Sequence, residues 1–140
     1  MESLLNPKSY HISMVFKLNI SNKGKTYKFE TDNESLVGRN IGEILKGGEL
    51  NPELAGFELE ITGTSDISGF PGFKHLEGSG YHRELLTFGQ GMKDTRNGMR
   101  LRKTQRGKEI SLKTSQINFK VLKEGSKKFE DLLNKEEKKE

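Results

Sequence analysis

Short runs of alternating apolar and polar residues constrain this fold more than any other feature of the sequence. The run at residues 15–21 alternates, with Phe16, Leu18 and Ile20 on one face, and residues 57–62 repeat nearly the same pattern as residues 16–21. Because successive side chains of a strand point to opposite faces, each run predicts a strand with one buried face. The chain holds 16 glycines but a single alanine, Ala55, which favours short strands joined by turns over long helices.

The same reading along the chain predicts a mainly-β fold. A Gly-containing turn at residues 22–24 joins the first run to a second strand, as in a β-hairpin. Two short helices are predicted, one at residues 36–45 and one that begins near residue 126. We therefore expect a small β-barrel or half-barrel of about six strands, and the two similar runs raise the alternative of an internal duplication. The further strands are predicted at residues 25–31, 81–88, 98–104, 108–114 and 117–122.

A chain of 140 residues is expected to form one domain. Residues 1–13 show no periodicity and contain Pro7, so we expect a disordered N-terminal extension. Residues 14–125 are predicted to form the β-barrel domain, and residues 126–140 a short C-terminal helix and tail. No run approaches the roughly 18 apolar residues of a membrane span, and the first residues lack the pattern of a secretory signal. With no cysteine, the composition fits a reducing cytoplasm.

Positive charge is concentrated in one part of the chain. Residues 70–122 contain 11 Lys and Arg against 4 acidic residues, whereas residues 1–69 contain 7 against 10. The guanidinium of arginine matches phosphate oxygens two at a time, so this block predicts contact with nucleic acid. The alternative is a solvated basic loop that binds nothing. Six cations without any acidic residue occupy residues 95–108: Arg96, Arg100, Arg102, Lys103, Arg106 and Lys108.

These cations are expected to lie on a basic hairpin within residues 93–108. We predict that the strand at 98–104 pairs with the strand at 108–114, which would place Arg106 at the tip. Arg100 and Arg102 would share the face opposite the apolar residues, where they could follow a phosphate backbone. Phosphate contacts position a protein without reading sequence.

Aromatic residues for stacking on single-stranded bases are missing between Phe88 and Phe119. A reader of single strands that relies on aromatic side chains is therefore disfavoured. Structured RNA recognised by its shape is the better fit.

Catalytic and metal sites have weak support in this sequence. The three histidines, His11, His75 and His82, do not have the spacing of a helical metal site, and no phosphate-binding glycine motif is present. We expect no enzyme activity, no metal, no cofactor and no small-molecule substrate. Residues 63–72 are rich in turn formers, so they predict a tight structural loop rather than an active site.

Three stretches resemble small-subunit ribosomal protein S-six of the archaeal and eukaryotic type: ITGTSDISGFP, RLRKTQRGKEIS and INFKVLKEG. Two positions depart from the family pattern, because Thr64 stands where the family usually has glycine and Gly72 where it usually has methionine. The first stretch carries a loop motif of Gly63, Asp66, Gly69, Phe70 and Pro71; the second carries Arg102, Lys103, Arg106 and Gly107.

The resemblance implies a compact β-barrel that is a structural constituent of the small ribosomal subunit and binds its rRNA. It implies neighbouring ribosomal proteins as partners, no membrane contact, and a cytoplasmic location on the ribosome. Eukaryotic members carry a long basic tail with phosphorylated serines. This chain looks like the short archaeal form, with Ser126 as the one serine of its tail, so that regulation is not carried over.

Two other functions stay open at this point. The first is a free-standing regulator that binds nucleic acid outside the ribosome. The second is a small enzyme with Asp66 and His82 in its active site.

Overall fold

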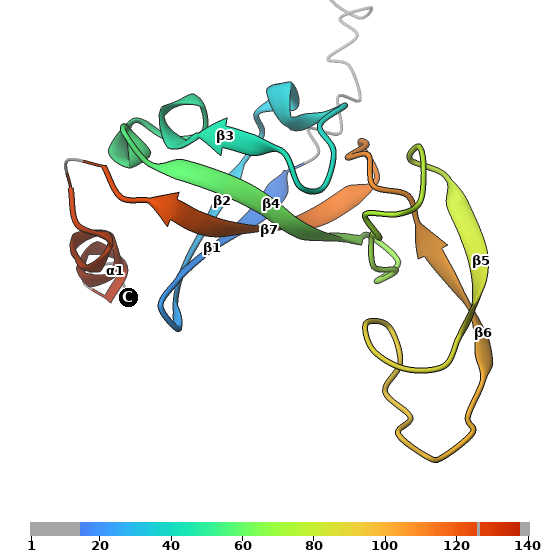
Figure 1. Cartoon of the computed structure of the whole chain (residues 1–140). Helices are drawn as coiled ribbons and strands as arrows, with labels where there is room; N and C mark the ends of the chain where they lie inside the picture. The colour runs from blue at the N-terminus through green and yellow to red at the C-terminus, as the bar shows by residue number, and fades with distance from the viewer. Residues whose placement is uncertain (1–14, 126, 138–140) are drawn as a thin grey trace, which may run out of the picture.

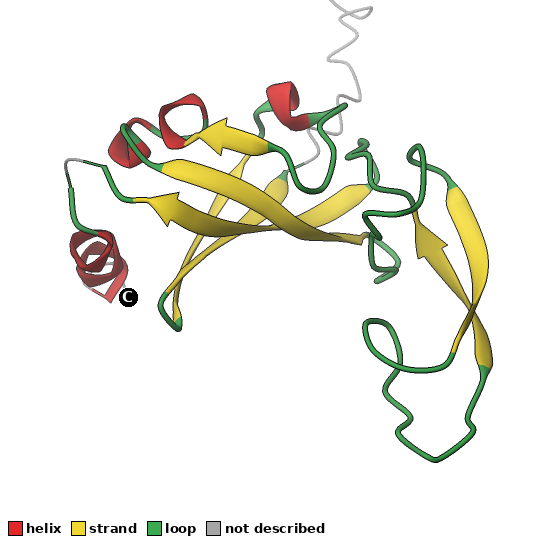
Figure 2. Ribbon diagram, viewed as in Figure 1, coloured by secondary structure: helices red, strands yellow, loops and turns green. Residues whose placement is uncertain are grey.

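The computed structural model describes residues 15–125 and 127–137. The predicted extension at residues 1–13 lies outside this part of the chain. The described part is mainly β, as predicted, with a five-stranded sheet, a separate two-stranded ribbon and an α-helix (Figures 1 and 2). Figure 1 shows the ribbon beyond one end of the sheet and the helix beyond the other.

The five-stranded sheet has the order β2-β1-β7-β4-β3. Strand β1 pairs in parallel with β7, and the remaining pairs are antiparallel. Lys23 and Gly24, both with positive φ (48° and 84°), form the two-residue turn that joins β1 to β2. The strands are β1 (Phe16–Asn22), β2 (Lys25–Thr31), β3 (Ile44–Lys46), β4 (Glu58–Asp66) and β7 (Thr114–Lys123).

The predicted barrel does not form. The sheet ends in β2 on one side and β3 on the other, and these two strands do not pair within the described residues. The two similar runs of the sequence become β1 and β4, which flank β7 with opposite polarity, one parallel and one antiparallel.

The core lies against one face of the sheet. The apolar positions of the two similar runs are buried there, as their period predicts: three come from β1 and three lie around the start of β4. Helix α1 (Phe129–Glu137) closes this core with Phe129 and Leu132, which are three residues apart and so lie on one side of the helix. The other buried apolar residues of the cluster include Tyr27, Leu36, Ile41, Leu45, Leu54, Ile110, Ile117, Phe119 and Val121.

The helix predicted at residues 36–45 is wrong. Gly38 and Gly42 adopt φ values of 88° and 97°, which no right-handed helix accommodates. Residues Glu34–Leu36 form a single 3-10 turn, which Asn33 caps by accepting a 3.0 Å hydrogen bond from the Ser35 N–H group. The rest of the segment is irregular until it joins the sheet as β3. Two more 3-10 turns, Gly47–Glu49 and Pro52–Leu54, lead into β4.

No helix within the described residues is both long enough and apolar enough to cross a membrane.

Candidate nucleic-acid interface

The basic part of the chain forms a ribbon, although not the predicted one. Strand β5 (Tyr81–Leu86) pairs antiparallel with β6 (Leu101–Arg106), and residues 87–100 connect them at the far end (Figure 2). The predicted pairing of residues 98–104 with 108–114 is therefore wrong. Arg106 stands at the end of the ribbon next to the sheet, opposite Tyr81, and not at a tip.

Residues 107–110 enter the body of the protein. The N–H groups of Lys108 and Ile110 donate to the carbonyl oxygens of Leu76 and Arg39, at 2.8 Å each. Ile110 is buried in the core. The backbone is so close at Gly107 that an added Cβ atom would lie 2.0 Å from the Gly78 carbonyl oxygen. The Arg-Gly pair of the motif thus fixes the point where the ribbon leaves the body.

Arg106 is a buried structural residue. Its side chain is 7% exposed, and its Nη1 atom lies 3.3 Å from the Asp66 carboxylate, whose side chain is 1% exposed. Its Nη2 atom donates to the Ser79 carbonyl oxygen and to the Ser111 hydroxyl, the latter at 2.7 Å. The guanidinium also lies over the Tyr81 ring, 5.2 Å from its centre. Arg106 therefore links the end of β4 to the segment that precedes β5 and to the segment that follows β6.

Asp66 is the acceptor of this cluster. It accepts hydrogen bonds from the Ser68 N–H group and, at 2.8 Å, from the Tyr81 hydroxyl. Burial alone would raise the pKa of Asp66. The hydrogen bonds from Ser68, Tyr81 and Arg106, together with the charge of Arg106, outweigh that effect and hold this pKa below its ordinary value. The carboxylate is thus ionised at neutral pH and pairs with Arg106.

The loop motif surrounds this cluster. The predicted loop at residues 63–72 is shorter than expected, because β4 continues to Asp66 and only residues 67–70 turn. Gly69 has a φ of 87°, as the turn requires. Phe70 packs edge-on against Tyr81, with ring centres 5.6 Å apart, and the Pro71 carbonyl oxygen accepts a 3.0 Å hydrogen bond from the Arg106 N–H group. The motif holds the ribbon to the sheet.

Thr64 and Gly72, the two positions that depart from the family pattern, lie next to each other in this region. A Cβ atom added to Gly72 would lie 2.1 Å from Oγ1 of Thr64 and 3.0 Å from Cδ1 of Ile41. The Thr64 side chain therefore occupies the space that a side chain at position 72 would need. Gly72 permits Thr64, and the two departures belong together.

This geometry predicts a coupled pair of substitutions. G72M alone should lower the free energy of unfolding by about 1–3 kcal/mol, because the new side chain overpacks the site. T64G should cost about 0.5–1 kcal/mol, as a glycine in a strand. The double variant should be more stable than the sum of the two changes predicts, by about 1 kcal/mol or more, when urea unfolding is measured. Additive effects would contradict the coupling.

The exposed cations lie on the outer part of the ribbon. Of the six predicted RNA-binding residues, Arg96, Arg100 and Arg102 are exposed, Lys103 is half-buried, and Lys108 is half-buried with its ammonium 3.0 Å from Glu77. Arg83, which the sequence reasoning missed, is exposed on β5 and shares a face of the ribbon with Arg102. Residues 81–105 carry six Lys and Arg against two acidic residues, so the ribbon is positively charged.

One of the two acidic residues of the ribbon is engaged by an arginine. The Asp94 carboxylate accepts three hydrogen bonds from the Arg96 side chain, two from Nε at 3.1 and 3.0 Å and one from Nη2 at 2.6 Å. These bonds and one from the Arg96 N–H group lower the pKa of Asp94. The Arg96 side chain is still 74% exposed. In the described part of the chain, Arg83, Arg100 and Arg102 form no ion pair.

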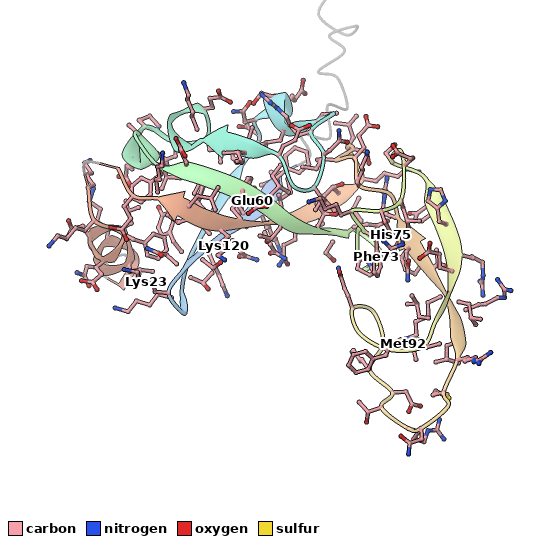
Figure 3. All side chains as sticks on the ribbon, in the orientation of Figure 1. Lys23, Glu60, Phe73, His75, Met92 and Lys120 are labelled. Atoms are coloured by element: carbon pink, nitrogen blue, oxygen red, sulfur yellow. The ribbon has the colours of Figure 1, made fainter. Side chains whose placement is uncertain are left out.

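A pocket of about 540 Å³ lies between the ribbon and the turn at residues 69–71. Met92 lines it from the connecting loop, Arg102 and Lys103 from β6, and Phe70 and Pro71 from the turn. Figure 3 shows Phe73 and His75 at the base of the ribbon and Met92 farther out. The amide of Gln105, also part of the lining, is buried and has no hydrogen-bond partner among the described residues.

The structure does not bring Asp66 and His82 together. Tyr81 and His82 are consecutive in β5, so their side chains point to opposite faces of the ribbon. Asp66 binds Tyr81, whereas the His82 ring lies 3.1 Å from the Glu77 carbonyl oxygen. His75 lies 3.0 Å from Glu84. Within residues 15–125 and 127–137, no group of three or more potential metal ligands is present.

Comparison with known proteins identifies the family. The family model described as Ribosomal protein S6e matches residues 16–134. The chain is 41% identical over 127 residues to small ribosomal subunit protein eS6 of Methanothermobacter thermautotrophicus, which covers 89% of this chain and 99% of the relative. It is 42% identical over 113 residues to the eS6 protein of Methanocaldococcus jannaschii, covering 81% and 85%.

A third archaeal relative, eS6 of Natronomonas pharaonis, is 39% identical over 117 residues and covers 81% of this chain and 89% of its own length. These relatives are ribosomal proteins and not enzymes. The chain belongs to the ribosomal protein S6e family, as the sequence motifs predict. Its archaeal relatives agree with the expected short archaeal form.

Proposed function

We propose that this protein is a structural constituent of the small ribosomal subunit and that it binds rRNA mainly through phosphate contacts from the β5–β6 ribbon. The assignment to the small ribosomal subunit is supported by the family match and by relatives that are named as small-subunit proteins. In this proposal the protein acts on the ribosome in the cytoplasm, with rRNA and neighbouring ribosomal proteins as its partners.

The proposed rRNA contact rests on one observation: some basic residues of the ribbon are paired within the protein, whereas others are exposed. The cations near the base of the ribbon are used within the protein: Arg106 pairs with Asp66, and Lys108 with Glu77. Those farther out are exposed and available to phosphate oxygens. Guanidinium groups suit this role because they bind phosphates in a bidentate manner. The proposed contact set is Arg83, Lys93, Arg96, Arg100 and Arg102, with Lys103 at its edge.

Co-sedimentation tests the ribosomal assignment. The full chain should migrate with small subunits in low salt, and a variant with Arg83, Arg100 and Arg102 replaced by alanine should be displaced at a lower salt concentration than the wild type, because fewer phosphates hold it. A protein that stays at the top of the gradient in low salt would point instead to a regulator that acts outside the ribosome.

A further inference from the structure

Phe88 is the most exposed large hydrophobic residue in the described part of the chain, at 87% of its surface. It follows β5 and precedes Gly89 and Gly91, whose φ values of 99° and 83° turn the chain back. A ring this exposed contributes no packing to its own fold. Exposed aromatic rings often serve in binding, because they offer a large rigid surface at little entropic cost.

The surroundings of Phe88 are polar and cationic. Its ring lines a hollow of about 350 Å³ together with Thr87 and residues 94–100. Arg96 and Arg100 belong to that lining, and both are exposed. The Asp94 carboxylate in the same lining is already bound by Arg96, so its charge is offset. The hollow therefore combines one aromatic ring with two exposed arginines, and its two arginines and one aspartate leave a net positive charge.

This combination matches the chemistry of an unpaired nucleotide. An aromatic ring stacks on the face of any base, while nearby arginines bind the phosphates on either side of it. Most of the side chains around Phe88 in this hollow are polar or charged, namely Thr87, Asp94, Thr95, Asn97 and the two arginines, and Met99 is apolar. A protein neighbour would need a larger apolar patch for the core of its interface. The charge of the ribbon likewise favours a polyanion.

We propose that Phe88 stacks on an unpaired base of rRNA, with Arg96 and Arg100 on the adjoining phosphates. This inference rests on the proposed function and adds to it a non-electrostatic contact. No aromatic residue lies between Phe88 and Phe119 in the sequence, and this absence predicted recognition of RNA by its shape alone. The fold places Phe88 itself at the basic end of the ribbon, 12 positions before Arg100 in the sequence.

The natural absence of tryptophan gives a direct test. F88W introduces a single indole that reports on its own surroundings. The full chain is titrated with a small-subunit rRNA transcript, and affinity is measured over a salt series for the wild type, F88A and F88W. I44A is the matched control, because Ile44 is 60% exposed on β3 in the main sheet.

We expect F88A to weaken rRNA binding by about tenfold, within the range for loss of one stacked base. Its salt slope should equal that of the wild type, because no charge is removed. F88W should bind like the wild type, and its fluorescence should be quenched in the complex as the indole stacks on a base. I44A should bind like the wild type.

Two results would overturn the inference while leaving phosphate binding intact. In the first, F88A binds as tightly as the wild type. In the second, F88W emission is unchanged by the rRNA transcript and shifts only with intact small subunits, which would assign Phe88 to a protein neighbour. A wild-type chain without salt-dependent rRNA binding would refute the proposed function and this inference together.

Discussion

R106M should lower the free energy of unfolding by about 3–5 kcal/mol, because it leaves the buried Asp66 carboxylate without its cation. Methionine keeps much of the length of the arginine side chain, so the loss would come from the charge and its hydrogen bonds more than from a cavity. Urea unfolding measures the change, and the slope of free energy against urea should stay the same if both states keep their exposed surface.

K108M is the matched control for this experiment. Lys108 is two residues away and pairs with Glu77, but that carboxylate is 85% exposed. Removing an exposed ion pair costs about 0–1 kcal/mol. A double variant, D66L with R106M, should recover much of the stability lost in R106M, because it removes the unpaired buried charge. If R106M costs no more than K108M, Arg106 does not hold the ribbon to the sheet.

The same cluster should make stability sensitive to acid. The pKa of Asp66 is lowered in the folded protein, so its contribution is complete above the ordinary pKa of about 3.8 and is lost as the pH falls through the folded value. The wild type should therefore lose this contribution below about pH 4, when urea unfolding is measured at a series of pH values. In R106M, burial without the cation raises the pKa of Asp66, so the difference in stability between the wild type and R106M should begin to shrink at a higher pH than that.

Local sequence patterns predicted four of the five strands of the main sheet and missed β3, which begins inside the segment predicted as a helix. The alternation at residues 16–20 and the turn at residues 22–24 each depend on neighbouring residues, and they correctly gave the β1–β2 hairpin. The alternation at residues 57–62 likewise predicted which face of β4 is buried. The C-terminal helix begins at Phe129, three residues after the predicted start, and helix ends are set by few residues.

The partner of β6 could not be predicted in this way. Residues 108–114 alternate like a strand, but their backbone groups bond to loops that are distant in the sequence, and Ile110 enters the core. Strand pairing depends on such distant contacts. The prediction of a closed barrel was wrong for a related reason. A barrel closes only when its two edge strands pair, and this pairing is not encoded in the local sequence of either strand.

At the site, the burial of Arg106 is the clearest feature that the local sequence could not predict. In the sequence it looks like another surface cation among six. Its burial depends on Asp66, 40 residues earlier, and on Tyr81 and Ser111. Arg96, Arg100 and Arg102 are exposed on the outer part of the ribbon, although the ribbon is paired differently from the predicted hairpin. Arg83 was missed because β5 was not recognised as the partner of β6, although its alternation with Tyr81 and Leu85 was visible in the sequence.

The salt dependence of rRNA binding is the sharpest test of the proposed phosphate contacts of the ribbon. Each phosphate contact contributes about −0.7 to −0.9 to the slope of log K against log salt, so the five exposed cations of the ribbon predict a slope of about −4. Replacing Arg83, Arg100 and Arg102 by alanine should flatten this slope by about 2–3 units. The fold should be retained, because all three side chains are exposed and form no ion pair within the described residues.

The control removes the same number of exposed cations at the other end of the molecule, where α1 lies in Figure 1. It replaces Lys127, Lys128 and Lys135, which are exposed on α1 and on the segment before it. The measurement is a titration of the wild type and both triple variants against small-subunit rRNA over a salt series. We predict that the ribbon variant loses about 2–3 units of slope and the helix variant almost none. A larger loss in the helix variant would show that rRNA binds a surface other than the ribbon.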